Sequence, residues 1–341
     1  MPTVPQGGKV LVSGANGYVA MWTAKLRVRG TVRSAEKGRS MSDYFTKPGY
    51  GEAFEFVVVE DIIEAQDGAF DEVIKDVDTI EHKASPAYFD APTPRKSWDL
   101  PFKEQLVCSR ALWNTLNRIM ITSSTAAIMT PNLSEPRVFS ERDWNEASPK
   151  EVEELGSKAA GTTVYRASKS LAERAVWEFY NQHKSQVSWD LTVINPSFVF
   201  GPPIHDVGSP KSLNSSLQTW YDLVVSESPK TKEMLSQSAS WVDVRDTAFV
   251  HVLALKKEAA GGERILLTSG VHVWQEWSKF HIASLPQKLT NDYLLFLVNV
   301  VNNLMPNLLP SHKLTPGYPE ILQQNTIPAS LEDFARHGWC D

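Results

Sequence analysis

Residues 9–20 read KVLVSGANGYVA, and this stretch decides the fold. The run Lys9–Ser13 predicts a short buried strand, and the apolar residues after the second glycine predict a helix. Glycines between a strand and a helix allow a tight turn and let a pyrophosphate approach the helix N-terminus. The alternative is an ordinary strand–helix turn that binds nothing. The expected dinucleotide contacts are Gly14, Asn16, Gly17, Tyr18 and Val19.

The second predicted strand ends in a cation rather than an acid. A site that prefers NAD usually has a carboxylate there for the ribose 2′-hydroxyl. This chain has Arg33, followed by Lys37. A planar guanidinium can pair with a 2′-phosphate, and a nearby ammonium adds a second charge. The expected cofactor is therefore NADPH, unless both cations only face solvent.

Two further strand ends face the same predicted cleft. Residues 54–59 predict a strand that leads into Asp61, which could meet the adenine amino group, and Ile62. Residues 79–83 lead into a turn placed to line the ribose side of the cleft. That turn supplies Ala84, Ser85 and Pro86.

A set of residues typical of a carbonyl-reducing site follows. Residues 122–124 (TSS) close an apolar run, Tyr165 precedes Lys169 by four residues, and residues 193–196 (VINP) end a later run. Positions i and i+4 share one face of a helix, so the tyrosine and the lysine can point at one ligand. Strands end and helices begin at one edge of an open parallel sheet, which would bring Ser124 to the same place.

The same spacing occurs again at Tyr180 and Lys184, so spacing alone does not identify the reactive tyrosine. Tyr180 lies fifteen residues beyond Tyr165, roughly 22 Å along a helix at about 1.5 Å per residue. It belongs to the far end of the helix, and we interpret it as structural or as a surface residue.

Each residue of the set has a distinct expected role. A phenol with an ordinary pKa of about 10 donates its proton poorly at neutral pH, and a neighbouring ammonium stabilises the phenolate. Lys169 would supply that ammonium. Ser124 would hold the carbonyl oxygen while Tyr165 protonates it.

The combined motifs resemble the extended short-chain dehydrogenase/reductases, and within them the dihydroflavonol 4-reductase-like branch with its fungal aldehyde, ketone and methylglyoxal reductases. The resemblance covers about residues 8–275. It is carried by GANGYVA (14–20), TVRS (31–34), EDI (60–62), HKASP (82–86), ITSSTAA (121–127), YRASK (165–169), NPSFVFGPP (195–203) and WVDVRD (241–246).

This resemblance implies a Rossmann domain, NADPH, and a catalytic set at Ser124, Tyr165 and Lys169. It also implies that Thr122, Pro196 and Val199 lie against the cofactor, the last two beside the nicotinamide. Residues 243–246 (DVRD) resemble a structural signature of the family rather than a catalytic one.

The chain departs from the pattern in two places. Arg33 follows Gly17 by only sixteen positions, and a crossover with its helix needs at least about 10 to 12 residues. The predicted helix Tyr18–Leu26 is therefore short, which predicts weaker cofactor binding and lower stability. Residues 284–326 show no family pattern, although this region helps to decide the substrate.

Alternating strand and helix patterns to about residue 267 predict an α/β fold, a doubly wound parallel sheet with a smaller C-terminal substrate lobe. We expect a cofactor domain at residues 1–199 with 238–268. Residues 200–237 with 269–341 would form the lobe, entered through the loop 201–210. A length of 341 residues suits this division.

The bulk properties exclude several classes of protein. A net charge of −6 and a pI near 5.8 disfavour a nucleic-acid partner. Two cysteines, Cys108 and Cys340, offer no disulfide framework and suit the cytoplasm. No metal-ligand spacing occurs among the histidines. The N-terminus MPTVPQGGK predicts no secretion signal.

The run Tyr293–Val301 is the strongest candidate for a membrane contact. It is shorter than the ~20 apolar residues that a span requires. A buried helix of the lobe is the preferred interpretation, and an interfacial anchor is the alternative. The sequence carries no signal for an oligomeric state.

The expected function is NADPH-dependent reduction of an aldehyde or ketone, with a small-molecule carbonyl compound as the partner. One alternative is an NAD-dependent nucleotide-sugar epimerase or dehydratase, against which Arg33 argues. The other alternative is a non-catalytic or defective variant of such a reductase, because of the short first helix.

Overall fold

The computed structural model describes residues 4–5, 7–23, 27–46, 54–60, 73–84, 116–131, 137–278 and 323–339. Residues 85–115 and the apolar run Tyr293–Val301 lie outside these ranges, as do Cys108 and Cys340.

Within the described residues, a seven-stranded parallel sheet forms the centre of the molecule, in the order β3-β2-β1-β4-β5-β6-β9. This order confirms the predicted doubly wound fold, because the direction in which successive strands are added reverses between β1 and β4, where ligands bind in such folds. The strands are β1 Val10–Ser13, β2 Val28–Val32, β3 Phe54–Val58, β4 Thr79–His82, β5 Arg118–Thr122, β6 Asp190–Pro196 and β9 Arg264–Leu267.

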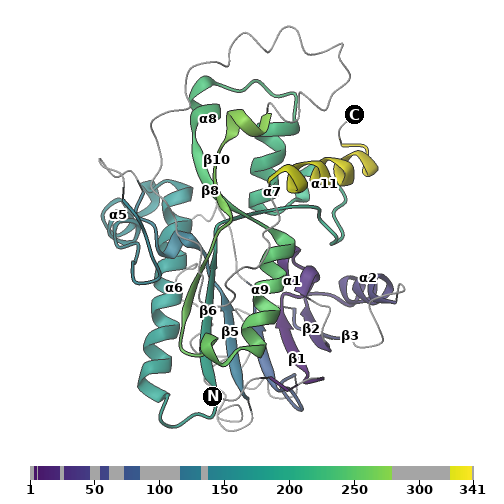
Figure 1. Cartoon of the computed structure of the whole chain (residues 1–341), viewed down its shortest axis with the longest axis vertical. Coiled ribbons are helices and arrows are strands. Elements are labelled where there is room, and N and C mark those ends of the chain that lie inside the picture. The colour runs from purple at the N-terminus through teal and green to yellow at the C-terminus, as the bar shows by residue number, and fades with distance from the viewer. Residues whose placement is uncertain are drawn as a thin grey trace.

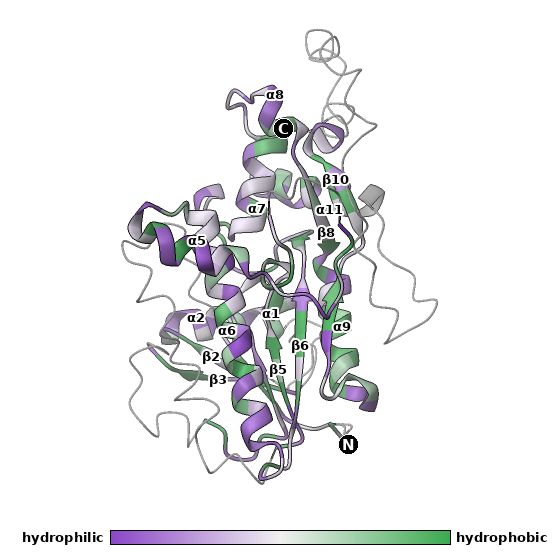
Figure 2. Ribbon diagram, turned by 90° about the vertical axis from the view of Figure 1, so that its left-hand side faces the viewer, coloured by the Kyte–Doolittle hydropathy of each residue, from purple (hydrophilic) through white to green (hydrophobic). Residues whose placement is uncertain are grey.

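Helices cover both faces of this sheet (Figure 1). α1 Tyr18–Thr23, α2 Ala35–Phe45 and α9 Val244–Lys256 pack on one face, and the long α6 Gly161–His183 packs on the other, preceded by α5 Ala147–Leu155. The strands are mostly hydrophobic, whereas the outer side of α6 is hydrophilic (Figure 2). Such two-sided burial accounts for near-continuous apolar strands such as VLVS in β1.

A second sheet lies beyond the carboxyl edge of the first (Figure 1). β8 Ser238–Asp243 pairs with β10 Gly270–Val273 antiparallel and with β7 Phe198–Phe200 parallel. Short helices surround it, and the C-terminal helix packs against them through Phe334. They are α7 Ser215–Trp220, the π-helical turn Tyr221–Val225, α8 Lys232–Ser236 and α11 Gln323–Arg336.

Two strands of the second sheet follow directly on strands of the main sheet. β7 follows β6 after a single residue, and β10 follows β9 after two. The predicted division, residues 1–199 with 238–268 against the remainder, stays a prediction about how the chain folds into units.

Aromatic side chains fill the core of the lobe. His272 is 1% exposed and its ring centroid lies 4.3 Å from that of Trp277 and 4.5 Å from that of Trp274. Burial lowers the pKa of His272 to about 3, because a charged imidazolium would lose its hydration. The ring is therefore neutral in the folded protein near neutral pH.

The buried His272 should make folding stability depend on pH. The unfolded histidine has an ordinary pKa of about 6.5, so the unfolded chain binds an extra proton as the pH falls below that value. The stabilisation is fully present above about pH 6.5 and is lost progressively toward pH 3.

His272→Phe should reduce the slope with which the unfolding free energy falls by about 1.4 kcal/mol per pH unit in that window. Urea unfolding of both proteins from about pH 7 to about pH 5 measures this. Parallel curves for the two proteins would show that His272 does not titrate on unfolding.

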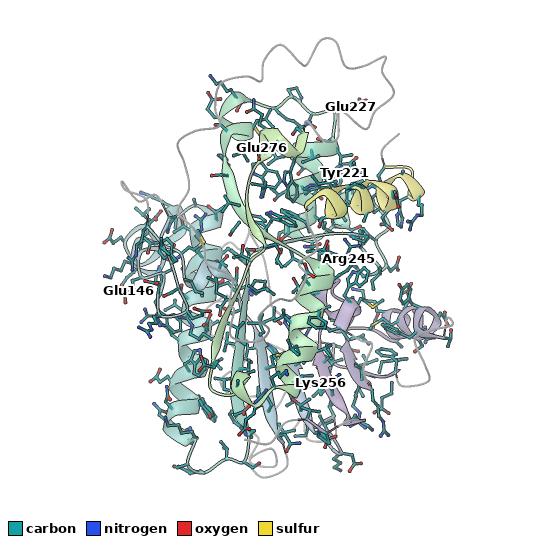
Figure 3. The ribbon with its side chains drawn as sticks, in the orientation of Figure 1. Glu146, Tyr221, Glu227, Arg245, Lys256 and Glu276 are labelled. Atoms are coloured by element: carbon teal, nitrogen blue, oxygen red, sulfur yellow. The ribbon has the colours of Figure 1, made fainter. Side chains whose placement is uncertain are left out.

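The start of α9 joins the sheet to the lobe. Asp243 is fully buried, caps α9 by accepting the Arg245 amide at 2.7 Å, and pairs with the Arg245 guanidinium at 2.7 Å and 2.8 Å. Thr326 of α11 donates to the same carboxylate at 2.7 Å. Figure 3 shows Arg245 at the end of α9 that faces the lobe, with Lys256 at the other end. The DVRD stretch therefore has the structural role that the sequence suggested.

α1 is short, as the sequence predicted, with six helical residues before the undescribed residues 24–26. Tyr18 and Trp22 attach it to the lobe by donating to the carbonyls of Gly201, at 2.7 Å, and Pro202, at 3.0 Å. Ala20 and Met21 pack into the core beneath it. The helix thus retains specific anchors on both sides despite its length.

Candidate active site

The glycine turn after β1 has the shape that a dinucleotide cradle requires. Gly14 has φ +64°, a left-handed conformation that favours glycine, and a Cβ there would lie 3.0 Å from the Ala84 backbone. The Gly14 and Ala15 amides bond to Thr31 at 3.2 Å and 3.0 Å. Asn16, Gly17 and Val19 are half-buried at the start of α1. The residues present therefore fit a pyrophosphate at this helix N-terminus.

The Tyr18 side chain does not face this turn. Its hydroxyl is buried against Gly201, and burial raises its pKa well above the usual 10. A contact between this residue and a cofactor would therefore come from its backbone.

Two cationic side chains lie at the end of β2, where the sequence predicted contacts with the 2′-phosphate of NADPH. Arg33 and Lys37 are both exposed, at the end of β2 and in the first turn of α2. Ser34 caps α2, its hydroxyl accepting the Lys37 amide at 3.4 Å. The positive end of the helix and the two side chains thus offer a phosphate-binding surface. Sequence reasoning missed Ser34, although a serine before a helical run is a standard N-cap signal.

Arg33→Ala should raise the Michaelis constant for NADPH much more than that for NADH. The lost contact is a charge-assisted hydrogen bond to a phosphate that NADH lacks, worth about 1.5 to 3 kcal/mol, or roughly 10- to 150-fold in affinity. Steady-state kinetics with each cofactor measures this ratio, and Arg39→Ala, an exposed cation on the same helix, is the matched control. Equal losses for the two cofactors would assign Arg33 to the fold.

Four residues predicted to line the cofactor cleft lie outside the described ranges: Asp61, Ile62, Ser85 and Pro86. Ala84 is described and packs against Gly14. Its amide and that of Lys83 both donate to the Ser13 hydroxyl at 3.2 Å. The ends of β1 and β4 are thereby held together beside the glycine turn.

The structure brings the predicted catalytic segments together. Ser124 follows β5 and caps the short helical turn η2 Thr125–Ala127, its hydroxyl accepting the Ala126 amide at 3.1 Å. This turn packs against α6, which carries Tyr165 and Lys169. The Lys169 ammonium lies 5.8 Å from the centre of the Tyr165 ring. All three side chains are half-buried, as residues that meet a ligand should be.

Tyr180 occupies a different environment. It is 8% exposed, its ring centroid lies 5.5 Å from that of Trp189, and burial raises its pKa. The structure therefore supports the structural interpretation of this second tyrosine.

His82 joins the catalytic edge of the sheet, and sequence reasoning did not single it out. Its Nδ1 lies 2.8 Å from the Ser13 hydroxyl. Its pKa is lowered to about 3, first by burial and then by the positive charges of Lys169 and Lys83. A neutral imidazole beside Lys169 adds no competing charge to the site.

The remaining predicted contacts lie on neighbouring strands. Pro196 is buried at the end of β6, in register with Leu267. Val199 is 7% exposed, and its side chain packs into the core of the lobe. Thr122 lies 2.9 Å from the His251 ring nitrogen, on the side of the sheet that α9 covers. These three residues lie at or near the carboxyl edge of the sheet, where the cofactor was expected. Their side chains mainly contact other residues of the protein.

An unexpected ion pair lies inside the sheet. The side chains of Glu81, on β4, and Lys83, just after β4, are 1% and 4% exposed and pair with each other. Burial lowers the pKa of Lys83, while the neighbouring carboxylate raises it. One Glu81 oxygen, Oε1, has no hydrogen-bond partner among the described residues. An acidic and a basic residue two positions apart in TIEHK (79–83), on one face of a strand, were a signal that the sequence reasoning did not use.

Across the described ranges, no group of histidine, cysteine and acidic residues is arranged to hold a metal ion. The helices in these ranges are also too short or too polar to cross a bilayer.

Known proteins resemble this chain in sequence and structure. Residues 141–267 match the NAD dependent epimerase/dehydratase family. A ketoreductase of Aspergillus niger is 35% identical over 280 residues, covering 77% of this chain and 78% of the relative. The NADPH-dependent methylglyoxal reductase of Saccharomyces cerevisiae is 30% identical over 283 residues, covering 78% and 80%.

The fold matches as well. The crystal structure of the yeast methylglyoxal/isovaleraldehyde reductase in complex with NADPH superposes with a TM-score of 0.80 at 25% identity, covering 97% of this chain and 99% of the other. The glycine turn, the strand order and these similarities agree, and the chain belongs to the extended short-chain dehydrogenase/reductase family, in its dihydroflavonol 4-reductase-like branch.

Proposed function

We propose that this protein reduces an aldehyde or ketone to the alcohol with NADPH. The proposal rests on one observation. Ser124 and the short helical turn that it caps, together called the Ser124 turn (residues 124–127), pack against α6, which carries Tyr165 and Lys169. It joins an oxygen-binding hydroxyl, a proton donor and a cation at the carboxyl edge of the sheet, beside the glycine turn.

NADPH supplies the hydride in this chemistry. The Ser124 hydroxyl donates to the substrate carbonyl oxygen and orients it. Tyr165 gives its phenolic proton to that oxygen as the hydride adds to the carbon, so that an alcohol forms. Lys169 stabilises the phenolate left on Tyr165 and is placed to hold the ribose. The tyrosine then regains a proton from solvent.

The choice of NADPH rests on the exposed Arg33 and Lys37 at the end of β2. Relatives named as NADPH-dependent reductases support it. An epimerase or dehydratase that holds NAD would be expected to have a carboxylate at this strand end. The reductase is therefore preferred over that alternative.

Binding and turnover measurements on the whole chain test the proposal. Calorimetry measures NADPH and NADH binding, and loss of nicotinamide absorbance follows turnover with aldehydes, ketones and flavanonols. We expect NADPH to bind more tightly and to be consumed with at least one carbonyl class. Tight NADPH binding without turnover on any of them would favour a non-catalytic protein. Preference for NAD with nucleotide-sugar conversion would favour the epimerase.

We further propose a cytoplasmic location, because the cysteine content suits a reducing compartment. The substrate would reach the site from the side of the lobe, which comprises residues 200–237 with 269–341 in this proposal.

A further inference from the structure

A buried polar network lies between α6, the helix that carries Tyr165 and Lys169, and the strands of the main sheet. Its centre is Glu173 on α6, which is 2% exposed and lies one turn after Lys169. Positions 165, 169 and 173 are each four residues apart, so they form one stripe on the helix. Glu173 is the buried end of the stripe, and its partners lie on three strand ends.

Both carboxylate oxygens of Glu173 are used. Ser123 and Asn195 each donate to Oε2 at 2.6 Å, and the Arg264 Nε donates to Oε1 at 2.6 Å. Ser123 follows β5, Asn195 lies near the end of β6, and Arg264 begins β9. One side chain thus ties α6 to three neighbouring strands.

The same network reaches the Ser124 carbonyl and the loop at residues 141–145. The Asn195 amide also donates to the Ser124 carbonyl at 3.1 Å. Arg264 donates to the carbonyls of Glu141 and Asp143 at 2.7 Å and 2.8 Å and stacks 3.7 Å over Trp144. Figure 3 marks the neighbouring Glu146, on the outside of this loop.

The loop at residues 141–145 in turn holds the C-terminal end of the Ser124 turn. Asn145 donates to the carbonyls of Ala126, at 3.0 Å, and Ala127, at 2.9 Å. The Ser124 turn is therefore fastened at both ends by groups that lead back to Glu173.

We propose that Glu173 is a positioning residue for the reaction, one that fixes the Ser124 turn relative to the helix carrying Tyr165 and Lys169. Its side chain is buried and bonded to Ser123, Asn195 and Arg264, so it would act through these residues. The inference rests on the proposed function for its kinetic consequence, but the positioning itself is a property of the folded chain.

Glu173→Gln should remove this positioning role, because glutamine has nearly the same size and shape as glutamate but lacks its second acceptor oxygen. Ser123 and Asn195 need an acceptor at one carboxylate oxygen, and Arg264 needs an acceptor at the other. A glutamine offers an acceptor at only one of the two positions, so while Asn195 keeps the orientation in which it also donates to the Ser124 carbonyl, one donor must face the glutamine NH2 group. We expect kcat to fall roughly 10- to 100-fold, because misplacement on the ångström scale has that effect on reacting groups. The dissociation constant for NADPH should be unchanged.

Asp190→Asn is the matched control. Asp190 and Arg118 are both fully buried and pair at 2.5 Å and 2.8 Å on β6 and β5, the strands that carry Asn195 and Ser123. Along their strands, Asp190 and Arg118 each lie five residues before Asn195 and Ser123, or roughly 16 Å at about 3.3 Å per residue. This variant also breaks a buried ion pair and also destabilises the fold, yet kcat per folded molecule should be unchanged.

Hydrogen exchange gives a readout that needs no turnover. The amides of Ala126, Ala127 and Ile128 bond within the Ser124 turn. In Glu173→Gln these amides should exchange faster than in the wild type, and in Asp190→Asn they should not. Equal exchange at the turn in both variants, or equal loss of kcat per folded molecule, would overturn the proposal.

A milder pair of variants covers the case in which neither ion-pair variant folds. Ser123→Ala removes one donor to Glu173, and Thr192→Val removes a buried bond from Thr192 to the Ala260 carbonyl, 2.7 Å away, on β6. Only Ser123→Ala should loosen the turn and lower kcat, by about 2- to 10-fold for one hydrogen bond. Equal effects of the two would also overturn the proposal. A wild-type protein without carbonyl reduction would refute the proposed function, and the exchange comparison would still decide the positioning role.

Discussion

Tyr165→Phe should abolish carbonyl reduction while leaving NADPH binding intact. The substitution removes only the phenolic oxygen, and with it the proton donor that half-buried Tyr165 presents beside Lys169. General acid catalysis contributes about 100- to 10,000-fold in rate, so kcat should fall by that range. Stopped-flow measurement of NADPH oxidation gives the rate, and calorimetry gives the binding constant.

Tyr180→Phe is the matched control on the same helix. Tyr180 has the same four-residue spacing to a lysine but packs against Trp189 at the other end of α6. We expect unchanged kcat in this variant. Equal losses of activity in the two variants would mean that the position of Tyr165 at the ligand edge has no catalytic meaning.

Lys83→Met should destabilise the protein by about 3 to 5 kcal/mol, because it leaves the Glu81 carboxylate buried without its partner. Glu81 lies between Val12 and Met120 in the sheet, both of which are core residues, and water cannot replace the lost ammonium there. Urea unfolding measures the change in free energy of unfolding.

The double variant Glu81→Val with Lys83→Met should behave differently. Replacing a whole buried pair by apolar residues is often neutral or stabilising by about 1 to 4 kcal/mol. It should therefore recover at least the stability lost in Lys83→Met alone. A double variant less stable than the single one would show that the pair contributes net stability to this sheet.

The sequence predicted the parts of this protein that follow from local patterns. The strand–glycine–helix turn at residues 9–20 and the strand ends at Ser124 and Asn195 lie where expected, because parallel strands bring their carboxyl ends to one edge. The choice of Tyr165 over Tyr180 followed from distance along a helix, which a sequence reports directly.

The Glu173 network could not be predicted, because its members come from residues far apart in the chain. Arg264 is 91 residues from Glu173, and a buried glutamate within a polar helix has no distinctive local pattern. Val199 was predicted to lie beside the nicotinamide from the resemblance alone, and that contact stays a prediction. Its side chain packs into the core of the lobe, which forms only when β7, β8 and β10 assemble.

The destination of the hydride tests the central claim most directly. The full-length protein is given NADPH deuterated at the reactive position of the nicotinamide and a carbonyl compound that it consumes, and the alcohol is analysed by mass spectrometry and proton NMR. The account predicts one deuterium on the carbinol carbon, with labelled alcohol formed about 100- to 10,000-fold more slowly when Tyr165→Phe replaces the wild type. An unlabelled alcohol from the wild type, or labelled alcohol formed equally by Tyr165→Phe, would contradict it.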